Sequence, residues 1–411
     1  IQMAGQTWDD HDRSGRFVAR DFGQNYLMTL QEEGNPIIYT NGDNDTFPLW
    51  YNQETEGFRT DARTCNLSYL QTDWYIDQMK KQAYESAPLP ISWDRADYIQ
   101  GTRDAAYIVP MMDKPIDLST GLNFVRSNDP KFKKIPGFNQ ELDYIPSETL
   151  IYKVDSATAL AKGLADSTDL LTEMTINLKG KTALGKQELI ILDMLQTNNW
   201  ERPIYYAITV NPDQFVGLDG YFEQTGLAYQ IVPKQADKNT NTEKMYDNVM
   251  NKFKWGGVDK PGVYIDENVM RMCKSYRMAL FNKLAEDLLK EGKNEKALNV
   301  LNKSMEVLPP ENVPLDYTAL STGELYYALD ETEKAEEIFT GIAENAMRNI
   351  DWFFRLRPSQ LASVTRELEH NLAVMQQVLA VSKHYNPEFA KKYQEEFDNY
   401  RMAYGSVRGN K

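Results

Sequence analysis

The sequence is poor in the side chains that commonly serve metal binding and proton transfer. It has two cysteines, Cys65 and Cys273, and three histidines among 411 residues. The two cysteines are too far apart in sequence to indicate a disulfide framework or a zinc site, and they leave the redox compartment open. The histidines are scattered along the chain, so we do not expect a mechanism that depends on a histidine cluster.

Common signatures of catalysis and of membrane insertion are also missing. The sequence has no G-x-S-x-G, H-E-x-x-H or G-x-G-x-x-G motif, and GKT at residues 180–182 has Thr175 where a phosphate-binding loop needs its first glycine. No stretch approaches the roughly 20 consecutive apolar residues that span a bilayer, and the N-terminus lacks a signal-peptide pattern. The chain begins at Ile1, as expected for a chain cut from a longer protein and equally for a processed N-terminus.

Positively charged residues are fewer than negatively charged ones. There are 45 Lys and Arg against 60 Asp and Glu, which gives a net charge of −15. Such a charge repels phosphate backbones, so nucleic acid is not an expected partner. Hydrophobic residues make up 42% of the chain, which is ample apolar surface for folding. A chain of this length exceeds one hydrophobic core, and we expect two domains.

The first part of the chain alternates helix and strand patterns. Apolar positions in residues 14–33 recur every four residues and predict a helix, and residues 37–40 predict a short strand. A helix over 47–56, a strand over 64–70 and a helix over 72–86 follow. Short connections between such elements imply parallel pairing, so the pattern predicts a layered, mostly parallel, Rossmann-like α/β domain.

The middle of the chain is less regular. Residues 88–147 are rich in Pro, Gly, Asp and Asn, which predicts loops or a small insertion packed on the sheet. The segments TLIYKV, RPIYYAITV and LAYQIVP are then expected to complete one sheet of five or so strands, with a helix over 186–197. Residues 234–244 are polar and are interpreted as an exposed loop. We place the α/β domain at residues 1–261.

After about Pro261 the pattern is almost wholly helical. Two segments match the offsets of a tetratricopeptide repeat. The matching positions are Phe281, Leu284, Ala285, Leu288, Ala297, Leu301, Ser304 and Pro309 in one copy and Gly323, Tyr326, Ala335 and Phe339 in the other. Long helices are expected over about 359–383 and 387–403, so residues 262–411 are predicted to form an all-α, tetratricopeptide-like domain. Stacked helix pairs commonly offer a concave surface to peptides or neighbouring domains.

An acidic loop follows the first predicted strand. The segment NPIIYTNGDNDTFPLWY runs from this strand into Asp43, Asn44 and Asp45. In α/β sheets, ligands bind at the carboxyl ends of strands, where two carboxylates suit a hard divalent cation or sugar hydroxyls. The alternative interpretation is structural, because Gly42 permits a positive φ, Asn44 tolerates a left-handed turn, and Asp45 or Thr46 can cap the next helix. Both interpretations stay open.

Two further groups of residues have a functional and a structural interpretation. Near the start, Asp10 and Asp12 precede a helix, where negative charge is favoured, or they share a metal site with Asp43 and Asp45. A divalent cation is the one cofactor that these acids suggest. The aromatic residues can stack on a sugar, or at their helical spacing can belong to the core. They are Trp50, Tyr51, Trp74, Tyr75 and Trp93.

Residues 39–80 carry a distinctive run of motifs: NGD before an aromatic helix, then EG-R-D, then an aromatic pair. These positions are Asn41, Gly42, Asp43, Glu56, Gly57, Arg59, Asp61, Trp74 and Tyr75. The run resembles the soluble C-terminal region of a family of large Bacteroidetes membrane proteins classed as glycosyltransferases. These are similar to a eukaryotic transmembrane protein O-mannosyltransferase that modifies plexins. The segments MAGQTWDDHDRSGR and NNWERPIYYA extend the likeness over most of residues 3–210.

The resemblance implies that the intact protein has an N-terminal multispan membrane region that holds a lipid-linked donor and the catalytic acid. This chain would then be the soluble, periplasmic part of an inner-membrane protein, with no transferase residue of its own. Its partners would be that membrane region and, through the helical tail, a protein acceptor or a neighbouring protein.

Three functional hypotheses follow. The first is an accessory, acceptor-binding region of a membrane protein glycosyltransferase. The second is a free-standing metal-dependent enzyme that acts on a sugar or phosphoester through Asp43 and Asp45. The third is a helical-repeat scaffold for protein interactions. The candidate ligand-binding residues are Asp43, Asn44, Asp45, Trp50, Glu56, Arg59, Asp61, Trp74 and Tyr75.

Overall fold

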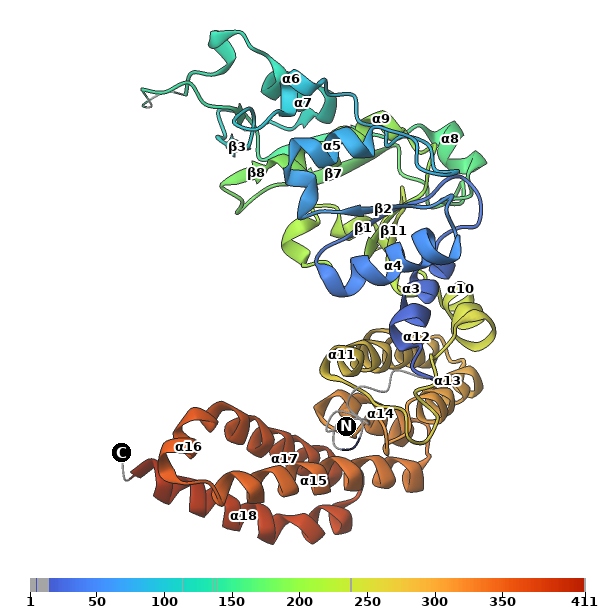
Figure 1. Ribbon diagram of the computed structural model, residues 1–411, viewed down its shortest axis with the longest axis vertical. Helices are drawn as coiled ribbons and strands as arrows, with labels where there is room; N and C mark the ends of the chain where they lie inside the picture. The colour runs from blue at the N-terminus through green and yellow to red at the C-terminus, as the bar shows by residue number, and fades with distance from the viewer. Residues whose placement is uncertain are drawn as a thin grey trace. The chain divides into compact units, whose positions relative to one another are not determined.

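The computed structural model describes residue 5 and residues 15–409, except residues 113, 136, 138, 237 and 238. It divides into two compact units (Figure 1). One unit is Arg20–Lys254, and the other is Trp255–Lys411 together with the residues up to Ala19. The first, which we call the α/β unit, mixes strands and helices, and the second, the helical unit, is all-α. The predicted fold class, α/β followed by all-α, is confirmed.

A five-stranded sheet forms the centre of the α/β unit, in the order β10-β11-β9-β1-β2. Its strands are β1 (Ile37–Thr40), β2 (Arg63–Asn66), β9 (Ile204–Ala207), β10 (Phe222–Gln224) and β11 (Ala228–Ile231). β1 pairs in parallel with both β2 and β9, whereas β11 pairs antiparallel with β9 and β10. The parallel strands are therefore β9, β1 and β2. They form the middle and one edge of the sheet, and the edge strand is β2.

Helices cover both faces of this sheet (Figure 1). On one face lie α3 (Val18–Thr29) and α4 (Asp43–Glu56). On the other lie α5 (Asp73–Met79) and α9 (Lys186–Asn198). Eleven of the 13 residues of α9 are buried, which makes this helix the core of its layer. Its predicted range, 186–197, is confirmed to within one residue.

Two three-stranded sheets extend the α/β unit. One has the order β5-β3-β8 (Tyr144–Ile145, Ala105–Ile108, Ala183–Gly185), and the other has the order β4-β6-β7 (Ile116–Asp117, Thr149–Lys153, Glu173–Asn177). The segment TLIYKV forms β6 and pairs with β4 and β7, so its predicted place in the central sheet is wrong. The central strands β1 and β9 are buried at every residue, because helices cover both faces of their sheet. In β6 only every second residue is buried, which suits a sheet with one covered face.

The segment over residues 88–147 contains regular elements as well as loops. These are α6 (Arg95–Tyr98), α7 (Leu118–Arg126) and the strands β3, β4 and β5. β3 pairs with β8 and β4 pairs with β6, so the segment shares its sheets with residues that follow it. Beyond it lie α8 (Ser156–Ala161) and α10 (Thr242–Asp247). The predicted loop over 234–244 is corrected at its end, because Asn241 accepts a hydrogen bond from the Lys244 N–H and starts α10 there.

The helical unit is a stack of helix pairs. A continuous helical stretch contains α11 (Glu267–Ser275), a π-helical segment (Tyr276–Asn282) and α12 (Lys283–Lys290). It packs on α13 (Asn294–Val307), and α14 (Leu320–Ala328) packs on α15 (Thr332–Phe354). α16 (Pro358–Ser363) leads to α17 (Thr365–Tyr385), which packs on α15 and on α18 (Pro387–Gly409).

The predicted repeat positions lie in the core of this stack. Seven matching positions of the first copy and two of the second are fully buried. They are Phe281, Leu284, Ala285, Leu288, Ala297, Leu301 and Ser304, and then Ala335 and Phe339. Gly323 is where α14 meets α15, and a Cβ there would lie 2.6 Å from the Phe339 ring. The helix pairs thus have the predicted register, and their assignment to the tetratricopeptide repeat stays a prediction.

The variant Gly323→Ala is expected to lower the free energy of unfolding by about 1–3 kcal/mol, because the added methyl group overpacks the buried Phe339 ring. The matched control is Gly405→Ala in α18, where an added Cβ meets nothing within 4 Å. Alanine is the better helix former, so the control should be as stable as the parent chain or slightly more stable. Thermal unfolding followed by circular dichroism measures both. Equal stability of the two variants would contradict the close packing of α14 on α15.

Candidate functional site: a cleft at the sheet edge

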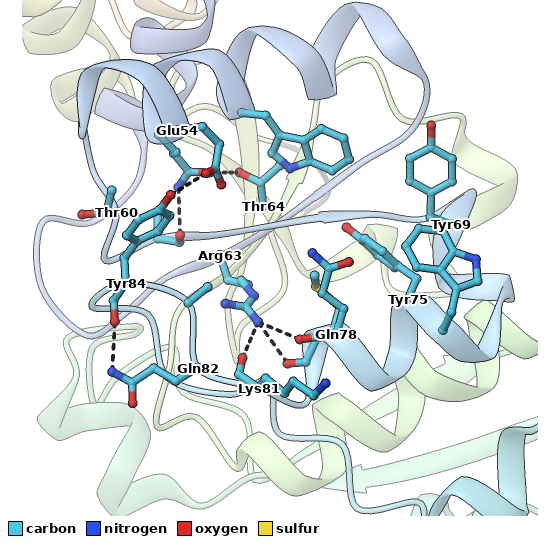
Figure 2. A pocket seen from close by; sticks show the side chains of 16 residues that line it. Glu54, Thr60, Arg63, Thr64, Tyr69, Tyr75, Gln78, Lys81, Gln82 and Tyr84 are labelled. Atoms are coloured by element: carbon cyan, nitrogen blue, oxygen red, sulfur yellow. Dashed lines mark hydrogen bonds between the residues drawn. The ribbon is translucent and has the colours of Figure 1, made fainter.

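A cleft of about 710 Å³ lies along the free edge of β2 (Figure 2). α4 forms one wall, and α5 with the loop that follows it forms the other, while Arg63 and Thr64 of β2 lie between them. Because β2 is the last strand of the sheet, the cleft occupies the place where a further strand would pair. Its volume is in the usual range for small-molecule sites.

A row of aromatic rings lines one end of the cleft. The Trp50 and Tyr69 rings are nearly parallel, at 17°, with centroids 6.2 Å apart, and the Tyr69 and Trp74 centroids are 6.1 Å apart. Phe47 continues the row, 5.8 Å from Trp50. Trp74 is 54% exposed and Phe47 is 47% exposed. Exposed rings in contact with one another form an apolar surface of the kind that marks a binding site.

Asn66, the last residue of β2, positions this row. Its backbone N–H, on the free edge of the strand, donates to the Tyr75 hydroxyl at 2.9 Å. Its side-chain oxygen accepts from the Tyr69 N–H at 3.0 Å, which fixes the turn before α5. Burial raises the pKa of the Tyr75 phenol well above its usual range. Tyr75 is therefore a neutral structural hydroxyl that fills the place of a strand partner.

The other end of the cleft is polar and closed. The Tyr84 hydroxyl donates to the Glu54 carboxylate, which joins the loop after α5 to α4 across the cleft (Figure 2). The Gln82 amide donates to the Tyr84 carbonyl oxygen at 2.9 Å. Tyr84 has φ +54°, a left-handed conformation that costs a bulky residue about 1–3 kcal/mol. The loop is thus held in the conformation that places Tyr84 against α4.

Arg63 lies in the base of the cleft and is 4% exposed. Its Nη2 donates to the carbonyl oxygens of Gln78, Met79 and Lys81, at 3.3, 3.3 and 2.5 Å, and so caps the end of α5 (Figure 2). Burial lowers the pKa of Arg63. Nε and Nη1 have no hydrogen-bond partner among the described residues. Buried donors without acceptors are costly, so the three hydrogen bonds of Nη2 offset the burial of Arg63 only in part.

The predicted acidic loop lies outside the cleft, at the carboxyl end of β1. Asp45 is 2% exposed, and its Oδ2 accepts from the Asn41 N–H at 2.9 Å and from the Thr209 hydroxyl at 2.7 Å. Burial raises the pKa of Asp45, and these hydrogen bonds oppose the shift. Asp45 therefore ties the loop to the segment after β9, while Asp43 and Asn44 are exposed.

The helix after this loop begins earlier than predicted. α4 starts at Asp43, not Phe47, so Asp43 and Asp45 lie in its first turn, where the helix dipole favours negative charge. Gly42 precedes the helix with φ +106°, the positive φ that the sequence indicated. The predicted cap by the side chain of Asp45 or Thr46 is not formed, because both residues lie inside the first turn of α4, which Gly42 precedes.

The charged residues of the EG-R-D motif hold α3 in place. Arg59 binds Asp61 through Nε and Nη2 at 2.8 and 2.9 Å, and it donates to carbonyl oxygens at the end of α3, including that of Gln31 at 2.7 Å. Glu56 accepts from the Arg20 Nε at 2.5 Å. Of the predicted site residues, the cleft brings together Trp50, Trp74 and Tyr75, and Glu56, Arg59 and Asp61 lie outside it.

The described residues do not form a metal site of the usual kind. Asp10 and Asp12 lie outside the described residues. In the ranges that the structure describes, no group of three or more His, Cys, Asp or Glu side chains comes together. Cys65 and Cys273 are free and buried, and burial raises the pKa of each thiol to about 12. Both thiols are therefore protonated at neutral pH, which is unsuited to nucleophilic catalysis.

Sequence reasoning missed Arg63, Tyr69, Gln78 and Tyr84. Tyr69 fell in a predicted strand that extended to Leu70, whereas β2 ends at Asn66 and residues 69–71 form a 3-10 turn. An Asn at this point, which can bond the backbone of a following turn, is the signal that could have shortened the strand. Tyr84 has no such signal, because its role depends on a contact with Glu54, 30 residues away.

A second cavity, of about 460 Å³, lies on the helical unit. It is lined by the first helix of each of three successive pairs, through Met278 and Asn282, through Glu324 of α14 and through Gln377 of α17. Met278 is 48% exposed, and Tyr317, just before α14, is 42% exposed. This groove is where stacked helix pairs commonly bind extended polypeptides.

A family model described as TMEM260-associated domain 2 matches residues 19–251. The matched range corresponds closely to the α/β unit, Arg20–Lys254. Comparisons with curated proteins and with solved structures find no match to the chain. Of the described helices, none combines the length and the apolar character that a membrane span requires.

The structural role of the acidic loop predicts unequal effects of its two acids. Asp45→Ala should lower the free energy of unfolding by about 2–3 kcal/mol, because the Asn41 N–H and the Thr209 hydroxyl lose their buried acceptor. Asp43→Ala, at an exposed position in the same turn, should change it by less than about 0.5 kcal/mol. Urea unfolding measures both. Equal effects would contradict the assignment of Asp45 as the anchor of the loop.

The raised pKa of Asp45 predicts a pH dependence. The folded chain holds the Asp45 proton more tightly than the unfolded chain, so stability due to this group falls as the pH rises from 3.8 through the raised pKa. Asp45→Asn keeps the shape of the side chain but does not titrate. The free energy of unfolding of the variant minus that of the parent chain should therefore increase between about pH 4 and about pH 7. Urea titrations across this range test the sign: no change would show that folding leaves the pKa of Asp45 unshifted, and a decrease would show that folding lowers it.

Proposed function

The chain belongs to the TMEM260-associated domain 2 family, and from this membership we propose that it is the accessory, acceptor-binding region of a TMEM260-like membrane protein glycosyltransferase. The family match over residues 19–251 is the observation that carries the proposal. In this proposal a membrane-embedded region of the whole protein holds the sugar donor and the bond-making groups. The present chain lies on the periplasmic side of the inner membrane and contributes binding surfaces.

The chemistry of the α/β unit supports a role without bond making. Three of the acids that the sequence singled out serve the fold: Asp45 anchors its loop, and Asp61 and Glu56 pair with arginines that fasten α3. The described thiols are buried and protonated. A general acid or nucleophile must face the cleft with its reactive atoms available. Glu54, the acid among the described lining residues, already accepts a hydrogen bond from the Tyr84 hydroxyl.

The groove of the helical unit supports acceptor binding. Met278 and Tyr317 give it exposed apolar surface, and its charged lining residues, Lys283, Glu286 and Glu324, are of both signs. Burial raises the pKa of Glu324, which places this carboxyl where solvent is partly excluded. An extended polypeptide with apolar side chains would complement such a groove. A pure interaction scaffold would use the same surface, so the experiment must measure glycosylation and not binding alone.

The whole membrane protein provides the test. Removing residues 255–411, the helical unit, should reduce glycosylation of a folded acceptor protein at least about tenfold while transfer to a short acceptor peptide persists. Met278→Ala in the groove should reduce it about threefold or more, because truncating a central apolar contact weakens binding. The control Met402→Ala, 66% exposed on α18, should have no effect.

The measurement is incorporation of labelled sugar into the acceptor at several acceptor concentrations. An unchanged rate and acceptor range after removal of the helical unit would refute acceptor binding by this unit. Loss of transfer to the short peptide as well would indicate a role in the transfer step itself.

A further inference from the structure

We propose that the cleft at the free edge of β2 is a carbohydrate-binding site that stacks a pyranose ring on Trp74 and Tyr69. The ligand class is a saccharide of one or two units. This inference rests on the geometry of the cleft and not on the proposed function. The site would bind sugar in the isolated chain whether or not the chain assists a transferase.

The aromatic row supplies the apolar half of such a site. Trp50, Tyr69 and Trp74 follow one another at centroid distances of 6.2 and 6.1 Å, and Trp74 is 54% exposed. One face of a pyranose presents C–H groups, which pack on the face of an aromatic ring, while its hydroxyls point outward from the ring edge. Asn66 fixes both Tyr69 and Tyr75 from β2, so the row is formed before a ligand arrives.

Unused polar groups supply the other half. Among the described residues, the Gln78 amide, the Lys81 ammonium and the indole N–H groups of Trp50 and Trp74 make no hydrogen bond, and all four side chains line the cleft. Gln78 lies between the aromatic row and Arg63 in Figure 2. A primary amide donates and accepts, and so does a sugar hydroxyl, so the two can bond in either direction.

The shape of the cleft favours a saccharide over a peptide. A peptide that extends the sheet needs a row of free backbone groups, but the outer N–H of Asn66 is taken by Tyr75. A proline-rich peptide needs a groove that is open at both ends, whereas Tyr84 and Glu54 join across one end of this cleft. A compact ligand with an apolar face and a polar edge fits the remaining space.

The charges of the lining residues add a preference. Arg63 and Lys81 are cations, and among the described lining residues the acid is Glu54, which is bonded to Tyr84. The cleft is thus locally positive on a chain whose net charge is −15. A saccharide that carries a carboxylate gains from this charge, so a uronate disaccharide should bind more tightly than a neutral one.

The experiment is calorimetric titration of the full chain with mannobiose, cellobiose and digalacturonate, each to about 10 mM. Trp74→Ala should weaken binding at least about tenfold, as truncation of a central aromatic anchor does, and Gln78→Ala about threefold or more. The matched control is Trp352→Ala, because Trp352 is 56% exposed on α15 and is not part of the cleft. It should bind as the parent chain does.

Trp74 and Gln78 are both exposed, so neither variant is expected to unfold, and circular dichroism melts verify this. If Trp74→Ala did unfold, Gln78→Ala would still report on the site. Absence of binding by all three disaccharides would overturn the proposal. So would equal binding by Trp74→Ala and Trp352→Ala, or binding of a proline decapeptide that depends on Trp74 when no saccharide binds. Tighter binding of mannobiose than of digalacturonate would overturn the role given to Arg63 and Lys81.

Discussion

The local structure around the sheet edge depends on Asn66, the last residue of β2. Its backbone N–H binds the Tyr75 hydroxyl, its side-chain oxygen binds the Tyr69 N–H, and its side-chain N–H₂ donates to the Thr46 hydroxyl at 2.8 Å. The Thr46 hydroxyl in turn lies within hydrogen-bond distance, 2.8 Å, of the Thr40 hydroxyl at the end of β1. One buried amide therefore connects the ends of two strands, the first turn of α4 and the aromatic row. A buried side chain with this many partners is hard to replace, because each partner would lose its hydrogen bond in a water-free site.

The position of the cleft follows from the way in which helices and a loop cover the edge strand β2. An exposed strand edge invites pairing with another chain, and proteins protect such edges by keeping them short or covering them. β2 has four residues, all buried, and α4, α5 and the loop to Tyr84 flank its outer side. Arg63 at the start of the strand caps α5, and Asn66 at its end holds Tyr75, so the covering elements are fastened at both ends of the strand. The space that remains between them is a cleft with fixed walls.

The sequence predicted those parts of the fold that depend on local patterns. The strand Ile37–Thr40 was found to the residue because it is a short apolar run, and α9 was found because its apolar run is long. The place of β6 was missed because the pattern of a strand does not indicate which strands it pairs with. Thr149 and Lys153, at the two ends of the run, could have indicated that one face of the strand is not buried. In the site, Trp50 and Trp74 were candidates by residue type. Tyr84 was not, because its contact with Glu54 spans 30 residues and its backbone has a left-handed conformation that no pattern in the sequence marks.

The two candidate surfaces differ in chemistry, so each suits a different class of ligand. The cleft of the α/β unit combines exposed rings with free amide and cationic groups, whereas the groove of the helical unit combines Met278 and Tyr317 with charged residues of both signs. The chemistry of the cleft suits a saccharide, and the chemistry of the groove suits a polypeptide. Weak individual affinity is an advantage for an accessory region, because a product held too tightly would block the next acceptor. On this argument the affinity of each surface, measured alone, should be modest.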